Sequence, residues 1–438
     1  MNFKTLFKGK DNILSKGIAS TVIKVLGALS SYFLSYLIAK KFGASGNGVF
    51  ALFMTYTIIL STFFYLGLDF FLVKHVSVLL REKKHKEIKT IYNKICIKYI
   101  APFSVLFLLI GTSLYWYFDY VLILFVTLGV MINIFVDINS AVLRGMKEAE
   151  WYSFFIQFSK HFITVILFLL PIYFEKSEGI LYLYLASLFV NGILSFFILN
   201  KKINNLSNDD EINEVKKYSM ISIFMSSKEF FFASIIIITL IWVDFILIDI
   251  FLDEIDAGVY SIALKLATLV SFGFTSFNAF LAPRISEIYA ERDMNKLQKV
   301  LTQNFMLVFP MLLIPLIVIL FFHETLLTFF GDEFKSGWKI LLLLAGGQFI
   351  NSIFGPVSLL LQMTNHQKIF QNILVITFVF KLIFALIFVQ LYGAEGIALA
   401  SFLGLSLWTI AGSYFVYKKI GVYSWFGIKE MKNIFSNE

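Results

Sequence analysis

Apolar runs of about 20 residues recur along almost the whole chain, and no other feature restricts the possible folds as strongly. A run of this length, coiled as a helix, matches the hydrocarbon core of a bilayer, which is about 30 Å thick. Hydrophobic residues make up 58% of the 438 residues and charged residues only 15%, which excludes an ordinary soluble globular protein. The sequence therefore predicts an all-α, polytopic membrane protein.

Twelve transmembrane helices are predicted from these runs. The seventh is longer than a single crossing requires, so its first turns, around Val215 to Met225, are expected to lie along the membrane interface. The predicted spans are residues 15–39, 46–73, 95–117, 120–143, 153–174, 178–200, 217–251, 257–283, 300–323, 338–363, 369–391 and 394–418.

Lysine and arginine are distributed very unevenly over the connections between these spans. With the N-terminus inside, 27 of the 37 basic residues fall in cytoplasmic segments and 5 in outer ones. Both termini are then cytoplasmic, and the net charge of +8 is a signal of topology, not of nucleic-acid binding. The single cysteine, Cys96, allows no internal disulfide and indicates no metal site, and no cofactor is expected.

Short sequence matches separated by 210 residues indicate an internal repeat. Gly48-Val-Phe-Ala51 opens the second predicted span and Gly258-Val-Tyr-Ser261 opens the eighth. Six helices in each copy give a parallel repeat, an arrangement typical of transporters that alternate access around a central cavity. We expect an N-terminal lobe over residues 1–200, a cytoplasmic linker over 201–218 and a C-terminal lobe over 219–438.

Five lysines lie inside the predicted spans, where each would cost roughly 2.5 to 3.5 kcal/mol if it faced lipid. They are therefore expected to face a water-filled cavity, and a cavity lined with ammonium groups suits an anionic passenger. The candidate substrate-binding residues are these five lysines and one arginine near the cytoplasmic boundary: Lys24, Lys160, Lys228, Lys265, Lys381 and Arg144.

Polar residues at helical spacing accompany three of these cations. The stripes are Ser20, Lys24, Gly27 and Ser31 in the first span, Asn133, Asp137, Ser140 and Arg144 in the fourth, and Ser261, Lys265, Thr268 and Thr275 in the eighth. Small and hydroxylated residues also mediate packing between membrane helices. The charge within each stripe favours a cavity wall.

Carboxylates within the spans are candidates for ion coupling or gating. Asp69 lies toward the cytoplasmic end of its span, where an ion pair that closes a gate is as plausible as a coupling site. For Asp137 and Asp244, structural pairing with a lysine and binding of a coupling ion (H⁺ or Na⁺) both stay open.

The chain resembles the Wzx-type oligosaccharide flippases. The similarity covers nearly the whole length and rests on loose motifs: Phe42-Gly-Ala-Ser-Gly-Asn-Gly-Val-Phe50, Leu66-Gly-Leu-Asp69, Leu143-Arg-Gly-Met146, and Asp256-Ala-Gly-Val-Tyr-Ser261 followed by Lys265. The superfamily to which these flippases belong also contains lipid II flippases and multidrug exporters of the MATE kind. The resemblance implies a cavity between two six-helix lobes, a multi-pass protein of the bacterial inner membrane, and roles for Lys24 and Lys265 in holding the diphosphate or acidic sugars of a polyprenyl-linked glycan.

The function predicted from these features is the flipping of a polyprenyl-diphosphate-linked oligosaccharide from the cytoplasmic to the outer leaflet. Its partners would be that lipid-linked glycan, membrane lipid, a coupling ion and enzymes of polysaccharide assembly, with no nucleic acid. A MATE-like exporter of small molecules is the alternative, although carboxylates and aromatic residues would be expected to dominate its cavity. A membrane-embedded glycosyltransferase or polymerase is the enzyme alternative, but the longest predicted outer loop, residues 324–337, is too short to build a catalytic site.

Overall fold

The structure is a computed structural model, and it describes residues 13–118, 120–171, 174, 176–207 and 219–425. Within these ranges the chain is helical and contains no strand. It divides into two compact units, unit 1 (residues 1–41 and 52–239) and unit 2 (residues 42–51 and 240–438). The predicted lobe boundaries stay a prediction, and most of the predicted linker, residues 208–218, lies outside the described residues.

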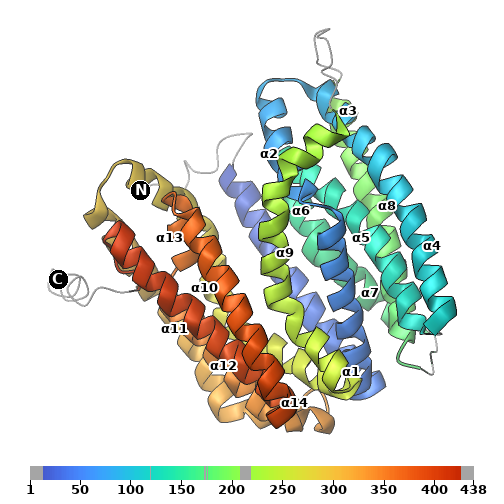
Figure 1. Ribbon diagram of the computed structural model, residues 1–438, viewed down its shortest axis with the longest axis vertical. Helices are drawn as coiled ribbons and strands as arrows, with labels where there is room; N and C mark the ends of the chain where they lie inside the picture. Colours follow the sequence, from blue (N-terminus) through green and yellow to red (C-terminus); the bar gives the residue numbers. More distant parts are fainter. Residues whose placement is uncertain (1–12, 119, 172–173, 175, 208–218, 426–438) are drawn as a thin grey trace. The chain divides into compact units, whose positions relative to one another are not determined.

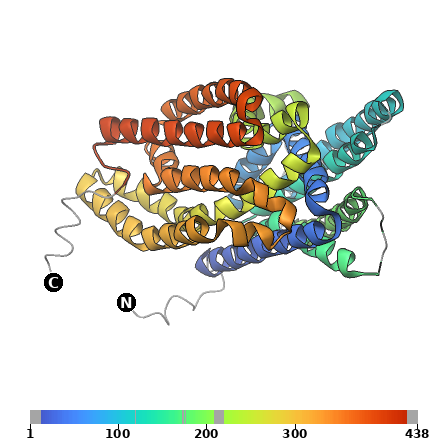
Figure 2. The same cartoon turned by 90° about the horizontal axis from the view of Figure 1, so that it is seen from below.

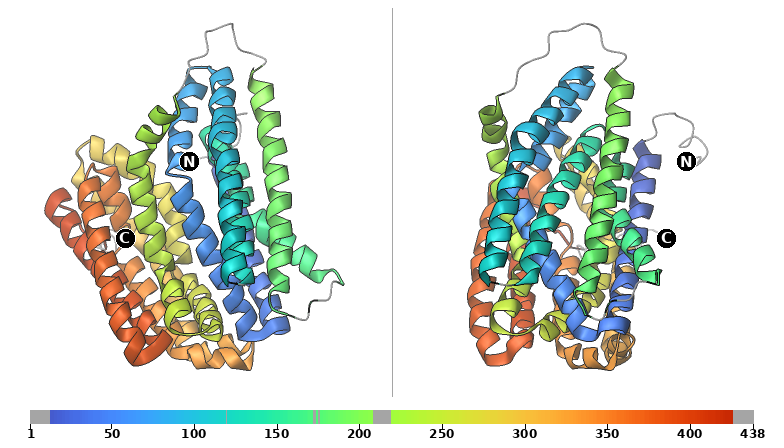
Figure 3. Two further views of the ribbon diagram at one scale, coloured as in Figure 1. Left: turned by 45° about the vertical axis from the view of Figure 1, so that its right-hand side comes forward. Right: turned by 90° about the vertical axis from the view of Figure 1, so that its right-hand side faces the viewer.

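Unit 1 is built around α5, which packs against helices on both sides (Figure 1). The right panel of Figure 3 shows α4, α5 and α8 running side by side. Its elements are α1 (Ile13–Phe64) without residues 42–51, α2 (Leu68–Arg81), α3 (His85–Ile95), the π-helix η2 (Cys96–Ile100), α4 (Ala101–Phe118), α5 (Val121–Gly145), α6 (Ala149–Ser153), the π-helix η3 (Phe154–Phe158), α7 (Ser159–Leu169), α8 (Gly179–Ser207) and most of α9 (Met220–Phe251).

Unit 2 consists mainly of three long helices and the shorter segments between them. Figure 2 shows α14 folded back on itself, with its two arms side by side along one edge of the unit. The elements are α10 (Glu254–Ala290), α11 (Met294–Thr328), the 3₁₀ helix η4 (Asp332–Gly337), α12 (Trp338–Ile353), α13 (Val357–Met363) and α14 (Gln367–Ile420).

Hydrogen bonds between buried polar side chains join the helices of unit 1. Within a membrane such bonds matter, because the hydrophobic effect does not drive helices to associate in lipid. The Tyr92 hydroxyl donates to Asn139 Oδ1 at 2.8 Å, and Asn139 Nδ2 donates to Ser195 Oγ at 2.9 Å, which joins α3, α5 and α8. Thr164 Oγ1 donates to Ser187 Oγ at 2.7 Å and joins α7 to α8 in the same way.

Nine helices of the described residues are long and apolar enough to cross a membrane, or ten if α12 and α13 form one broken span. Two of the nine are much longer than one crossing requires, and each contains one non-helical residue, Gly43 in α1 and Gly393 in α14. These glycines have φ of 66° and 57°, a left-handed conformation that glycine adopts without the clash of a Cβ atom. The chain is a polytopic helical membrane protein, as the hydrophobic runs predict.

The second predicted span, residues 46–73, is wrong as a single helix. Leu66 and Gly67 both have positive φ, at 53° and 72°, and they separate α1 from α2. The Tyr99 hydroxyl donates a hydrogen bond to the carbonyl oxygen of Phe64. A backbone carbonyl at the C-terminal end of α1 is therefore hydrogen-bonded despite the break. This break cannot be predicted from the hydrophobicity of the sequence, because apolar residues continue on both sides of it.

Residues 44–48 and 254–258, which correspond to each other in the predicted repeat, contact each other within unit 2. A Cβ atom on Gly48 would lie 1.6 Å from the carbonyl oxygen of Glu254, and one on Gly258 would lie 1.9 Å from that of Ala44. Each glycine therefore packs against the backbone one turn before the other glycine. The contact is reciprocal, as expected for two copies related by a two-fold axis.

Candidate functional site

A cavity of about 300 Å³ lies within unit 1 and carries two cations and two carboxylates on its wall. Its volume is at the lower end of the range for small-molecule sites and leaves room for a group of the size of a phosphate or a single sugar ring. The lining residues are Ile58, Thr62, Tyr65, Asp69, Phe70, Val73, Asn133, Asp137, Ala141, Arg144, Tyr152, Ile156, Lys160 and Ile238.

Helix α5 presents one polar stripe to this cavity. Asn133, Asp137 and Arg144 follow each other at helical spacing, and Asn133 Nδ2 donates to Asp137 Oδ2 at 2.9 Å. This hydrogen bond fixes the carboxylate of Asp137. Ser140, the fourth member of the predicted stripe, is fully buried, and Ala141 lines the cavity instead.

The Arg144 guanidinium stacks over the ring of Tyr152, with 4.9 Å from Cζ to the ring centroid. Such a contact orients the planar cation. Arg144 also lies in the last turn of α5, where the helix dipole favours a positive charge.

Lys160 reaches the cavity from the segment formed by α6, η3 and α7. Tyr152, Ile156 and Lys160 all line the wall, and the π-helical turn η3 lies between the first and the last of them. One extra residue in such a turn changes which face the following residues present, and π-helical turns are frequent at functional sites. The described part of the chain shows no carboxylate within ion-pairing distance of Lys160.

Asp69 is placed by the helix break at Leu66 and Gly67. It lies in the first turn of α2, where the free N–H groups of the helix favour a carboxylate. Its Oδ1 atom is buried and has no hydrogen-bond partner among the described residues. A buried oxygen of this kind can accept a hydrogen bond or bind a cation.

The structure thus brings together four of the predicted site residues, Asp69, Asp137, Arg144 and Lys160. The predicted polar stripe includes Asn133, whereas no sequence pattern selects Tyr65 or Tyr152 as a site residue. Tyr65 lies four residues before Asp69, but the helix break at Leu66 and Gly67 falls between them, so helical spacing does not connect the two.

Lys24 and Lys228 do not line this cavity. Both are exposed, on α1 and α9. The stripe around Lys24 is largely a packing face, because Ser20 Oγ is hydrogen-bonded to Ser153 Oγ at 2.6 Å and Gly27 lies against the backbone of Gln157.

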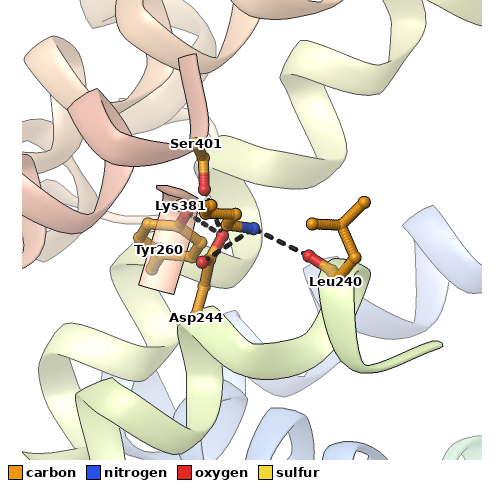
Figure 4. A network of polar contacts seen from close by, with 5 residues as sticks. All are labelled: Leu240, Asp244, Tyr260, Lys381 and Ser401. Carbon is orange, nitrogen blue, oxygen red and sulfur yellow. Dashed lines mark hydrogen bonds and ion pairs between the residues drawn. The ribbon is translucent and has the colours of Figure 1, made fainter. Parts of the chain in front are cut away.

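The other two predicted cations, Lys265 and Lys381, belong to unit 2. Lys265 is half-buried on α10. Lys381 is almost fully buried and forms an ion pair with Asp244, with 2.9 Å between Nζ and Oδ1 (Figure 4). Its ammonium group is therefore already compensated by a carboxylate, and we leave Lys381 out of the proposed substrate site.

A family model described as polysaccharide biosynthesis protein matches residues 13–289, which is more than half of the chain. The chain belongs to the polysaccharide biosynthesis protein family. This family membership agrees with the resemblance noted from the sequence motifs, and it places the cavity residues of α2, α5 and α7 inside the matched region.

One curated relative of this polysaccharide biosynthesis protein comes from Haloferax volcanii and is named Probable low-salt glycan biosynthesis flippase Agl15. The two are 23% identical over 244 residues, which is 55% of this chain and 49% of the relative. The chain thus spans about half the length of the relative that it matches.

Two solved structures have the same fold as this polysaccharide biosynthesis protein. An inward-facing multidrug resistance MATE family transporter of the MOP superfamily gives a TM-score of 0.68 at 14% identity, covering 92% of this chain and 98% of that chain. The lipid II flippase MurJ, in an inward closed conformation, gives 0.66 at 18% identity, covering 97% of this chain and 90% of that chain. At these identities the likeness concerns the fold alone.

Proposed function

We propose that the protein is a transporter that flips a polyprenyl-diphosphate-linked oligosaccharide from the cytoplasmic to the outer leaflet for the synthesis of a cell-surface polysaccharide. The observation that carries the proposal is the cavity of unit 1, in which Arg144 and Lys160 stand beside hydroxyl, amide and carboxylate groups inside a membrane-spanning unit. Family membership and the name of the Haloferax volcanii relative support it.

The chemistry of such a substrate fits these groups. The lipid tail stays in hydrocarbon, but the diphosphate and the sugars lose their hydration when they cross, at a cost that hydrogen bonds and opposite charges offset. Arginine and lysine bind phosphate. Tyrosine and asparagine donate hydrogen bonds to sugar hydroxyls and accept them, and carboxylates accept them. Because two carboxylates balance the two cations, binding is weak enough for release on the other side.

The proposed topology has twelve transmembrane helices and both termini in the cytoplasm. The apolar part of α1 spans 46 residues and α14 spans 54, or about 69 and 81 Å, so each is proposed to cross twice with its bend at Gly43 or Gly393. With the broken span of α12 and α13, this brings the ten candidates to twelve. Two six-helix lobes, alternating access and a place in a bacterial inner membrane complete the proposal.

Transport of this kind makes and breaks no covalent bond, so we propose a non-enzymatic role. Enzymes of polysaccharide assembly would supply the lipid-linked glycan on one side and extend it on the other. Depletion of the protein should cause an intact lipid-linked glycan to accumulate at the inner leaflet, detectable by mass spectrometry after leaflet-selective labelling. Accumulation of shortened glycans instead would point to a missing transferase and contradict the proposal.

Lys24 and Lys265 serve in this proposal as additional contacts for the diphosphate, outside the cavity of unit 1. Replacing both with glutamine should reduce glycan export at least 10-fold at normal expression, because each charged contact contributes about 1.5 to 3 kcal/mol. Export is measured as surface polysaccharide in a depleted strain. Unchanged export in the double variant would remove these two residues from the mechanism.

Asp69 and Asp137 are proposed to couple transport to a gradient of H⁺ or Na⁺. The Asp137→Asn variant should retain the glycan more tightly, since removing one carboxylate leaves the cavity with a net positive charge, and it should lose most of its response to an imposed gradient. Flipping in proteoliposomes, measured with and without pH and Na⁺ gradients, tests both effects. A variant with the gradient response of the wild type would exclude Asp137 from coupling.

A MATE-like exporter of cationic small molecules is the second candidate. The two carboxylates and two tyrosines of the cavity favour it, and so does the fold shared with a MATE transporter. Accumulation assays with cationic dyes distinguish the candidates. An exporter of cationic small molecules would lower the dye content of cells that express it, whereas a glycan flippase would not change it.

A further inference from the structure

Among the described residues of unit 2, the most completely enclosed charges belong to Lys381 and Asp244, which are 6% and 3% exposed. Lys381 Nζ lies 2.9 Å from Asp244 Oδ1 and donates to the carbonyl oxygen of Leu240 at 2.8 Å. The other carboxylate oxygen, Oδ2, accepts hydrogen bonds from the Tyr260 hydroxyl at 2.7 Å and from Ser401 Oγ at 2.6 Å. Figure 4 shows the ammonium group between Asp244 and the Leu240 carbonyl.

These groups come from four separate stretches of chain. Asp244 and Leu240 belong to α9 and Tyr260 to α10, while Lys381 and Ser401 lie on the two arms of α14. The lysine stem runs along the facing arm, because a Cβ atom on Gly404 would lie only 3.3 Å from Lys381 Cβ. The site is thus built around one cation at a point where helices meet.

Oxygen atoms that surround a compact monovalent charge also suit a monovalent metal ion. A carboxylate and a backbone carbonyl are hard, oxygen-donating ligands of the kind that alkali and alkaline-earth cations take. Thr377, one helical turn before Lys381, is buried, and its hydroxyl has no hydrogen-bond partner among the described residues, so it could supply a further oxygen.

We infer that Asp244, the Leu240 carbonyl and the surrounding hydroxyls form a monovalent-cation site that the Lys381 ammonium fills as a tethered, permanent occupant. Unit 2 then keeps its buried carboxylate compensated without taking an ion from solution. Any dependence of transport on Na⁺ or H⁺ arises outside this site. Shortening Lys381 vacates the site and allows Na⁺ to enter it.

The test compares thermal unfolding of purified wild type and of Lys381→Ala in detergent. Both are measured in the chloride salts of Na⁺, K⁺, methylammonium and N-methyl-D-glucamine at equal ionic strength. N-methyl-D-glucamine is too large to enter the site. In its chloride salt, Lys381→Ala should therefore unfold about 5 °C or more below the wild type, because Asp244 stays buried without a counter-charge. Na⁺ or methylammonium should restore most of this loss with a saturable dependence on concentration.

The matched control is the double variant Lys381→Ala with Asp244→Asn, which should show no recovery specific to a cation. The wild type should have one Tm in all four salts. A folded Lys381→Ala variant with the same Tm in all four salts would overturn the inference.

If Lys381→Ala yields no monodisperse protein in any salt, the inference is tested on the wild type alone. Equal Tm values in Na⁺ and N-methyl-D-glucamine support a site already filled by Lys381. A rise with Na⁺ that Asp244→Asn removes would show that an ion from solution binds beside the lysine, and the inference would be wrong.

Discussion

Replacing Arg144 with glutamine and Lys160 with methionine should abolish measurable flipping while the protein still folds. Each change removes one charged contact to a phosphate or an acidic sugar, at a cost of about 1.5 to 3 kcal/mol, so each should reduce affinity about 10- to 150-fold. The double variant also leaves Asp69 and Asp137 without opposing charges in the cavity, which repels an anion. Flipping of a labelled lipid-linked glycan in proteoliposomes measures the effect.

Two further variants separate charge from position in this experiment. Arg144→Lys keeps the charge but loses the planar stack over Tyr152, so we expect an intermediate loss. Lys201→Gln removes an exposed lysine of α8 that is not part of the cavity wall, and it should flip the glycan at the wild-type rate. If Lys201→Gln and the double variant lost activity equally, general surface charge, and not the cavity, would be responsible.

Alanine at Gly48 or Gly258 should destabilise the protein severely. The added methyl group would lie 1.6 or 1.9 Å from a carbonyl oxygen of the facing helix, and no side chain can move aside because the obstacle is backbone. Overpacking of this kind costs about 1 to 3 kcal/mol or more, which exceeds the gain of about 1 kcal/mol from replacing a helical glycine with alanine. Thermal unfolding followed by size-exclusion chromatography provides the measurement.

The matched control is Gly192→Ala in α8. A Cβ atom there would meet its nearest neighbour, Ile132, at 3.6 Å, which is an ordinary van der Waals distance. Gly192→Ala should therefore leave the Tm unchanged or raise it slightly. A stable Gly258→Ala variant would mean that the two helices are not in backbone contact.

The sequence predicted the class of the protein and part of the candidate site because both depend on local patterns. Runs of apolar residues mark membrane helices wherever they occur. The spacing of Asn133, Asp137 and Arg144 places them on one face of α5, and the cost of a charge in the membrane marks Lys160.

What the sequence leaves open or misses depends on tertiary contacts. Pairing of Asp244 with a lysine is one of the two roles that the sequence leaves open for it, but no spacing rule identifies Lys381 as the partner, because the two residues are far apart in the chain. The break at Leu66 and Gly67 lies in a continuous apolar run. The π-helical turn η3 changes the face that Lys160 presents, and no residue pattern in the sequence marks this turn.

The reciprocal packing of Gly48 and Gly258 has a consequence for the history of the chain. Each glycine touches the residue that precedes its counterpart by four positions, so under the predicted internal repeat the same surface would serve both sides of the contact. A chain half as long could have made this contact with a second copy of itself, as a homodimer with a two-fold axis. Fusion of two such genes would then have preserved an existing interface, and each copy would afterwards have been free to acquire its own charges, such as Lys160 in one and Lys381 in the other.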